Sequence, residues 1–293
     1  MGMPMRGAGG KSSRRSIWVT GFAVVAAVSF SAVAYMYLTL PDVRGLAEAN
    51  PTTTAFMELR AREAEAEGGQ ARRTYTWVPY RRISAHLKRA VLVAEDSAFW
   101  EHEGIDLEQI KVSIETAIER GNAPRGASTI TQQLAKNLYL SPSRDPLRKL
   151  RELIITRRLE AELPKARILE LYLNVVEWGD GVWGAEAAAR RYFGVPAAAL
   201  SRAQSALLAG ALINPIRYSP GRPPPRLLRR QQIILGRMGS VEPPPASVEV
   251  APARTADNAQ AEAPDTEPSP EVVPEVPAEP VPGGVEPAPA PQP

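Results

Sequence analysis

The sequence predicts a mainly α-helical domain between an N-terminal membrane-spanning helix and a disordered C-terminal tail. Three observations favour this fold class: an uncharged stretch near the N-terminus, apolar residues at helical spacing through the middle, and a proline-rich end without apolar periodicity. The 293 residues are 44% hydrophobic, which is enough to bury a sizeable core. Cysteine is absent and only two histidines occur, which excludes a disulfide scaffold, a cysteine nucleophile and a histidine-rich metal centre.

The N-terminal region has a basic segment, residues 1–16, followed by an uncharged stretch over residues 17–40. As a helix this stretch is about 36 Å long, more than the ~30 Å hydrocarbon core of a bilayer. The preceding basic residues predict a cytoplasmic N-terminus and place everything after Leu40 on the other side of the membrane. The alternative is a cleaved signal peptide, since Ala32-Val33-Ala34 resembles a cleavage site. The length of the apolar stretch favours a retained anchor.

The middle of the chain consists of a linker and a folded domain. Residues 41–74 are predicted to form a linker, in which the charged and alanine-rich segment from Pro51 to Gln70 forms a short stalk helix. Residues 75–238 are predicted to form the mainly α-helical domain, because alternating strand patterns are scarce there and helical patterns are abundant. Two apolar helix faces are expected, one formed by Ile83, Leu87, Val91 and Ala94 and one by Ile110, Ile114 and Ile118. Helix starts are expected at Asp145-Pro146, at Pro164 and at the capping box beginning at Ser201.

The C-terminal residues 239–293 have a composition unlike the rest of the chain. They hold fifteen of the 29 prolines and sum to a charge of −9, so the remainder of the chain sums to +12. Such a segment cannot bury enough apolar surface to offset its ordering entropy, which predicts disorder or a semi-extended tether. The basic body favours an anionic partner: nucleic acid, phospholipid or a phosphorylated substrate.

A candidate catalytic carboxylate follows the apolar helix that ends at Ala94. Glu95 and Asp96 come next, and on a continued helix Glu95, Phe99 and His102 would share one face. A carboxylate at the end of a buried helix is desolvated, which makes it a stronger base once it is ionised. The alternative is an ordinary solvated helix terminus.

Two further segments carry polar side chains that could bind a phosphorylated ligand. The first, from Gly126 to Asn137, opens with residues that can cap a helix. Its polar side chains lie on one broad face, and they are Ser128, Gln132, Gln133 and Lys136. The second segment combines Arg144, Arg148 and Lys149 with Glu152. The alternatives are a solvated amphipathic face for the first segment and an exposed i,i+4 ion pair, Arg148 with Glu152, for the second.

These segments together resemble a known family. Five motifs match in order: Glu95-Asp-x-x-Phe99-x-x-His102-x-Gly104, Gly126-x-Ser-Thr-Ile-Thr-Gln-Gln-Leu-x-Lys136-Asn137, Arg148-Lys149-x-x-Glu152, Ile168-Leu-Glu-x-Tyr-Leu-Asn174, and a block from Gly184 to Gly194. Over about residues 77–220 the chain resembles the monofunctional biosynthetic peptidoglycan transglycosylases of glycosyltransferase family 51.

The resemblance implies a lysozyme-like fold and an enzyme anchored in the bacterial inner membrane with a periplasmic catalytic domain. It implies polymerisation of lipid II by inverting transfer from an undecaprenyl-diphosphate donor to the 4-hydroxyl of the acceptor GlcNAc. The implied partners are lipid II, the nascent glycan strand and the membrane, with transpeptidases or divisome and elongasome proteins as further candidates. Nucleic acid is not expected, because the body lies outside the membrane and has no recognition motif.

The resemblance also implies roles for individual residues. Glu95 matches the general base and Glu152 the second essential acid. Ten matched positions are expected to contact substrate or shape its site: Asp96, Phe99, His102, Ser128, Gln132, Gln133, Lys136, Arg144, Arg148 and Lys149, with Asn137 beside them. No cofactor is evidently required; the family often uses Mg²⁺ or Mn²⁺, but no metal site can be assigned from these residues.

Two other functions fit parts of the sequence. A lytic muramidase with a lysozyme-like fold would also use a glutamate in a helical cleft, but it would not need the cations at Lys136, Arg148 and Lys149. A membrane-anchored scaffold without activity would be expected to have degenerate motifs, and the motif positions are intact.

Overall fold

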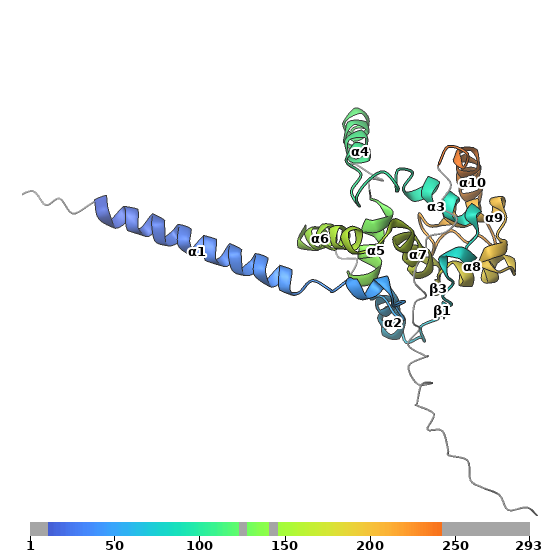
Figure 1. The fold of residues 1–293 in the computed structure, drawn as a ribbon, viewed down its shortest axis with the longest axis horizontal. Helices are drawn as coiled ribbons and strands as arrows, with labels where there is room; N and C mark the ends of the chain where they lie inside the picture. Colours follow the sequence, from blue (N-terminus) through green and yellow to red (C-terminus); the bar gives the residue numbers. More distant parts are fainter. Residues whose placement is uncertain (1–10, 123–127, 141–145, 242–293) are drawn as a thin grey trace, which may run out of the picture. The chain divides into compact units, whose positions relative to one another are not determined.

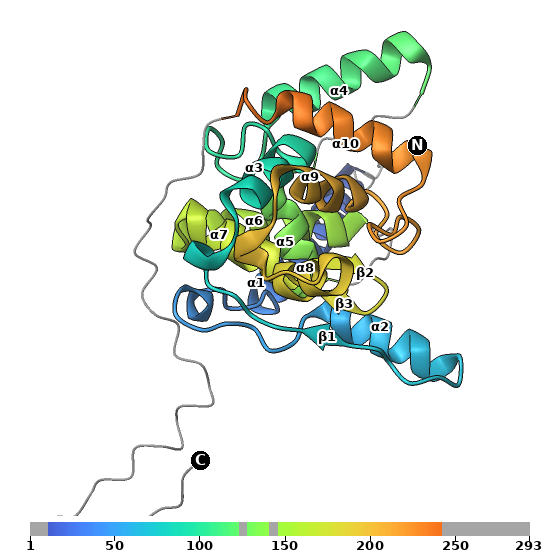
Figure 2. The same cartoon turned by 90° about the vertical axis from the view of Figure 1, so that its right-hand side faces the viewer.

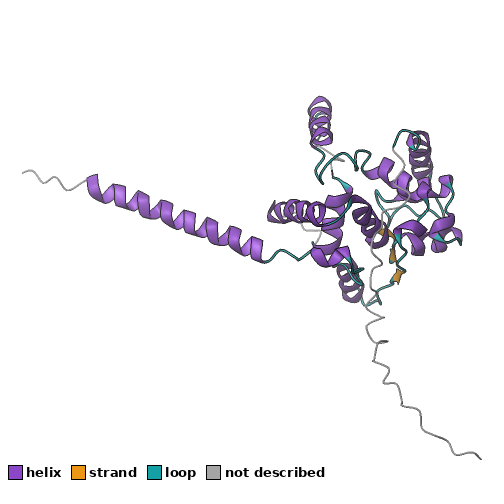
Figure 3. Ribbon diagram, viewed as in Figure 1, coloured by secondary structure: helices purple, strands orange, loops and turns teal. Residues whose placement is uncertain are grey.

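The computed structural model describes residues 11–122, 128–140 and 146–241 (Figure 1). As predicted, these residues are mainly α-helical (Figure 3). The α-helices are α1 Lys11–Leu38, α2 Ala55–Ala66, α3 Ala85–Glu95, α4 Leu107–Arg120, α5 Ile130–Tyr139, α6 Pro146–Glu162, α7 Lys165–Val175, α8 Ala185–Phe193, α9 Arg202–Ala211 and α10 Pro225–Arg237. The strands β1 Thr74–Tyr75, β2 Glu177–Gly179 and β3 Val182–Trp183 form a small sheet in the order β1-β3-β2, with β1 parallel and β2 antiparallel to β3.

The predicted N-terminal apolar helix is present as α1. Its segment Trp18–Leu38 is 21 residues long, has a mean hydropathy of 1.9 and contains no buried residue. By length and composition this segment can cross a membrane, and it fits a single-pass anchor.

The core of the domain forms around α7. Every residue of α7 from Ala166 to Val175 is buried, and α5 packs against both α6 and α7. Helix α3 packs against α9 and α10, and Ile83, Leu87 and Val91 are buried as their spacing predicts. Figure 2 shows α4 and α10 along one side of the domain, and α2 with β1 along the opposite side.

The second predicted apolar face has a different environment. Helix α4 forms, but Ile114 and Ile118 are 45% and 76% exposed, and its buried residues are Ser113 and Ala117. The helix extends away from the body (Figure 1), so its apolar face has little of the described domain to pack against. Periodicity predicted the helix correctly without indicating what covers it.

Residues 41–74 are more than a linker, because much of this segment packs against the domain. Val43 and Met57 are buried. The guanidinium of Arg167, itself 1% exposed, donates to the carbonyls of Leu46 and Ala49 and to the side chain of Asn50. A buried guanidinium needs such acceptors, so α7 fixes the chain that precedes the predicted boundary at Tyr75.

A buried amide on α7 holds the chain that leads into α3. Asn174 accepts a hydrogen bond from the backbone N–H of Val78 and donates to the carbonyls of Val78 and Glu170, each at 2.9 Å. We expect Asn174→Ala to lower the free energy of unfolding by about 3 kcal/mol and the melting temperature by about 6–12 °C, because it leaves buried backbone groups unpaired. Thermal unfolding followed by circular dichroism measures this. Asn122→Ala, at an exposed site, is the matched control and should melt like the wild type.

Candidate active site

Glu95 is the last residue of α3 and lies inside the domain. Burial raises the pKa of its carboxyl group, and the hydrogen bond from Gln133 opposes that rise. The side-chain amide of Gln133 on α5 donates to Oε2 of Glu95 at 3.1 Å. The hydroxyl of Tyr172 on α7 donates to Oε1 of Gln133 at 2.9 Å. Tyr172 therefore fixes which end of the Gln133 amide faces the carboxylate.

The second oxygen of Glu95 faces α10. Oε1 is buried and, among the described residues, accepts no hydrogen bond. Nη2 of Arg230 lies 3.5 Å from it and also donates to the carbonyl of Ala94 at 3.3 Å. The charge of Arg230 lowers the pKa of Glu95 against the larger effect of burial. Oε1 is consequently the oxygen available to take a proton from a bound hydroxyl group.

Asp96 joins the loop after α3 to the start of α5. Its Oδ2 accepts from the backbone N–H of Ile130 at 2.9 Å, and its Oδ1 lies 2.9 Å from Nε2 of His102. Nδ1 of His102 accepts from the backbone N–H of Gly104 at 3.1 Å, which assigns the ring proton to Nε2. Asp96 and His102 thereby orient the loop beside Glu95, and Phe99 is fully buried below it.

Gly104 occupies a position that only glycine fits. Its φ is +83°, and a Cβ there would lie 2.7 Å from Cγ2 of Thr156 on α6. Its carbonyl accepts from the hydroxyl of Thr129, the N-cap of α5. The close approach of the loop to α6 and α5 holds Asp96 and His102 in place.

Helix α5 begins with a capping box that uses one of the predicted contact residues. Gln132 is buried, and its side-chain oxygen accepts from the backbone N–H of Thr129 at 3.2 Å. The amide of Asn137 donates to the carbonyl of Gln133 at 2.8 Å. Both side chains therefore shape the helix. Ser128 is exposed and lines a pocket of about 180 Å³ together with Glu95 and Asp96.

The predicted cationic residues on α5 and α6 converge on one buried acid. Glu152 is 4% exposed, accepts from Nη1 of Arg148 at 2.7 Å and pairs with the ammonium of Lys149. Burial lowers the pKa of Lys136. The positive charges of Arg148 and Lys149 lower this pKa further, whereas the negative charge of Glu152 raises it. Lys136 also lies over the ring of Phe56 at 5.2 Å. Arg144, predicted for the same cluster, lies outside the described residues.

The described residues do not fit a divalent cation beside Glu95. The ligand atoms of Asp96, His102 and Asp106 lie within 4.8 Å of one another. However, both oxygens of Asp96 and Nδ1 of His102 already accept hydrogen bonds, and Asp106 caps α4 through the N–H of Gln109. Nδ1 of His102 has a single lone pair and would have to give up the bond from Gly104 to hold Mg²⁺, which also prefers oxygen ligands.

Two residues of this site lie outside the predicted set. Tyr172 belongs to the apolar stripe of α7, so its spacing indicates only a core position. Arg230 is one of several arginines in α10, and no feature of the sequence distinguishes it from the others.

Comparisons with known proteins identify the family of this chain. A family model described as Transglycosylase matches residues 62–239. A biosynthetic peptidoglycan transglycosylase of Azoarcus sp. (strain BH72) is 51% identical over 196 residues, covering 67% of this chain and 84% of the relative. Those of Laribacter hongkongensis and Nitrosospira multiformis are 52% and 47% identical, again over 67% of this chain, and over 86% and 85% of the relatives. The chain therefore belongs to the transglycosylase family of glycosyltransferase enzymes.

Proposed function

We propose that this peptidoglycan transglycosylase polymerises lipid II into glycan strands, with Glu95 as the general base. The observation that carries the proposal is the environment of Glu95. Its Oε1 is buried and accepts no hydrogen bond from any residue that the structure describes, while Gln133 and Arg230 hold the carboxylate in place from two sides. A carboxylate positioned in this way can accept a proton from an incoming sugar hydroxyl.

The proposed transfer is a single displacement. The oxygen of the acceptor 4-hydroxyl forms a bond to C1 of the donor sugar as the bond between C1 and the diphosphate oxygen breaks. The hydroxyl proton passes to Oε1 of Glu95, and the diphosphate leaves with the bonding electron pair on its lipid. Attack from the face opposite the leaving group inverts C1.

The leaving diphosphate needs positive charge rather than a proton. Lys136, Arg148 and Lys149 supply three cations on α5 and α6, and Glu152 fixes the positions of two of them. Preorganised cations of this kind stabilise charge that develops in the transition state. The cluster therefore favours transfer from a lipid diphosphate over the lytic alternative, whose leaving group is a sugar.

The proposed location follows from α1. A basic segment precedes a helix long enough to span a bilayer, so the positive-inside rule puts the N-terminus in the cytoplasm and the domain in the periplasm. There the domain meets lipid II in the membrane that anchors it. The strands it makes are uncrosslinked, so a transpeptidase is the class of partner that must act next.

The test is a gel assay of the full chain in detergent with labelled lipid II. We expect a ladder of glycan strands that lysozyme digests. Cleavage of preformed glycan without a ladder would instead identify a lytic enzyme and would overturn the proposal.

Arg230 gives the reaction a defined pH dependence. Because its charge lowers the pKa of Glu95, Arg230→Gln should raise that pKa and move the acidic limb of the rate profile to higher pH. We expect the rate at pH 6, relative to pH 8, to fall roughly 3–10-fold compared with the wild type. Initial rates across pH measure the effect. Arg222→Gln removes the same charge from an exposed loop and should leave the profile unchanged; a profile unaltered in Arg230→Gln would show that Arg230 acts only in packing.

A further inference from the structure

A largely buried ion pair joins the end of α6 to the start of α7, and none of the roles described above uses it. Nζ of Lys165 lies 2.8 Å from Oε1 of Glu160, and the two side chains are 21% and 8% exposed. Lys165 is the first residue of α7, whereas Glu160 lies in the last turn of α6. A helix dipole disfavours a cation at the N-terminus and an anion at the C-terminus. The pair therefore occupies positions that neither helix favours for its own stability.

The ammonium group of Lys165 also contacts the ring of Phe99. Nζ lies 4.5 Å from the centroid of that ring, within the range of a cation–π interaction. Phe99 is fully buried, and such an interaction is stronger where water is excluded. The ring of Phe99 in turn stands edge to face against the ring of His102, with 6.3 Å between the centroids. Lys165 thus reaches the loop after α3 through an aromatic ring of that loop.

Glu160 contacts the same loop and the start of α5. Its Oε1 accepts from the hydroxyl of Thr131 on α5 at 2.5 Å, in addition to pairing with Lys165. A Cβ built on Gly104 would lie 2.9 Å from Cγ of Glu160, so the loop packs closely on this side chain. One carboxylate oxygen consequently bonds to both α5 and α7 at the place where the loop lies against them.

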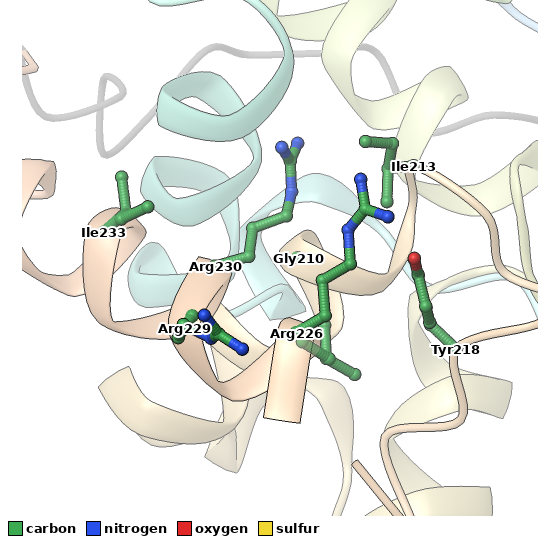
Figure 4. Close-up of a pocket in the computed structure, with 8 residues that line it drawn as sticks. Gly210, Ile213, Tyr218, Arg226, Arg229, Arg230 and Ile233 are labelled. Atoms are coloured by element: carbon green, nitrogen blue, oxygen red, sulfur yellow. The ribbon is translucent and has the colours of Figure 1, made fainter. Parts of the chain in front are cut away.

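This loop is the third support of Glu95. Gln133 bonds to the carboxylate from α5. Arg230 faces it from α10, and Figure 4 shows the side chain of Arg230 extending away from that helix, beside a pocket between α9 and α10. The loop itself begins with Asp96, which follows Glu95 directly in the chain and pairs with His102. The orientation of the loop therefore affects the direction in which the carboxylate of Glu95 points.

We propose that Lys165 and Glu160 are positioning residues for the proposed base. Lys165 holds Phe99, and through its ring the loop after α3, in the orientation in which Glu95 meets the acceptor hydroxyl. Glu160 fixes Lys165 and ties it to α5. This inference rests on the proposed function, and both residues act through the loop rather than by contact with substrate. A displacement of about 1 Å at a reacting group can lower a rate about 10²-fold, so a small movement of the loop has a measurable effect.

The first test separates kcat from the concentration dependence. Lys165→Met keeps the apolar stem and removes the charge, so kcat for polymerisation should fall about 10–100-fold. The lipid II concentration for half-maximal rate should change less than about two-fold, because no substrate contact is lost. Lys165→Arg keeps a cation that can lie over the ring and should retain about half of the wild-type kcat or more. Arg62→Met removes a cation from the exposed pair with Glu58 on α2 and is the matched control. A wild-type kcat in Lys165→Met would overturn the inference.

A double variant separates positioning from stability. Lys165→Met alone leaves the acid of Glu160 without its cation and should lower the melting temperature. Adding Glu160→Gln removes the remaining charge, so the melting temperature should return close to the wild-type value. The kcat of the double variant should nevertheless stay low, because the ring of Phe99 still lacks its cation. Recovery of kcat together with the melting temperature would show a purely structural ion pair and would overturn the inference.

Nuclear magnetic resonance follows the loop without turnover. The chain has two histidines, His86 and His102, so the ring signals of isotope-labelled histidine can be assigned with a His86→Gln chain. Lys165→Met should shift the signal of His102, which senses the ring of Phe99, and Lys165→Arg should not. An unmoved His102 signal would overturn the inference alone, even where the wild type forms a ladder from lipid II. A shifted signal in a chain whose wild type forms no ladder would overturn the proposed function, and the inference with it.

Discussion

Glu95→Gln is expected to reduce the rate of glycan polymerisation by about 10³-fold or more while the fold is retained. The amide has the volume of the carboxylic acid, and its oxygen can still accept the hydrogen bond from Gln133. It cannot accept the hydroxyl proton at neutral pH. Loss of a general base typically costs about 10²–10⁴ in rate, and Glu95 is the only carboxylate of the described site with an unbonded, buried oxygen. The measurement is the initial rate of ladder formation from lipid II.

The same variant should also be more stable than the wild type. Burial raises the pKa of Glu95 above its ordinary value of 4.5, so the folded state is penalised wherever this group is ionised. The gain from Glu95→Gln should be full above the raised pKa and should vanish as the pH falls to about 4.5. A gain of about 1 kcal/mol would raise the melting temperature by about 2–4 °C.

Glu101→Gln is the matched control, because Glu101 is an exposed acid in the loop that follows α3. It should leave both the rate and the melting temperature unchanged. Polymerisation at a wild-type rate in Glu95→Gln would remove Glu95 from the mechanism. A loss of rate together with a large fall in melting temperature would mean that the substitution damages the fold.

The helices of this fold could be predicted because their signals are local. The capping box at Ser201 and Gln204 begins α9 as expected, and Thr129 caps α5. The spacing of apolar residues could not predict which side chains are buried, because burial depends on what packs against each helix. Ile118 lies on a correctly predicted helix yet is exposed, and residues 41–74 pack because Arg167, over a hundred positions later, needs acceptors.

The candidate site divides in the same way. The sequence pointed to Glu95 and to the acid–cation cluster around Glu152, since each lies within one short segment. In the structure the side chains of Gln132 and Asn137 make hydrogen bonds within α5, and their contact with substrate stays a prediction. The sequence missed Arg230, which reaches Glu95 only because α10 packs against α3. No local pattern encodes a contact between residues 135 positions apart.

Glu152→Gln is expected to lower kcat by about 10²–10³-fold with the fold intact. The neutral amide no longer anchors Arg148 and Lys149, so these cations lose the positions in which they would meet the diphosphate. Arg148 and Lys149 are 19% and 46% exposed and can turn toward water, which limits the effect on stability. Loss of the Glu152 charge also removes the influence that raises the pKa of Lys136.

This second effect gives the prediction a signature beyond a lower rate. With Glu152 neutral, Lys136 should lose its proton at lower pH, so the alkaline limb of the rate profile should move toward neutral pH. Glu162→Gln, an exposed acid at the end of the same helix, is the matched control and should behave like the wild type. Equal losses of rate at every pH would mean that Glu152 acts on Arg148 and Lys149 alone. A wild-type rate in Glu152→Gln would contradict the prediction, because it would show that the reaction does not depend on the acid that holds these cations in place.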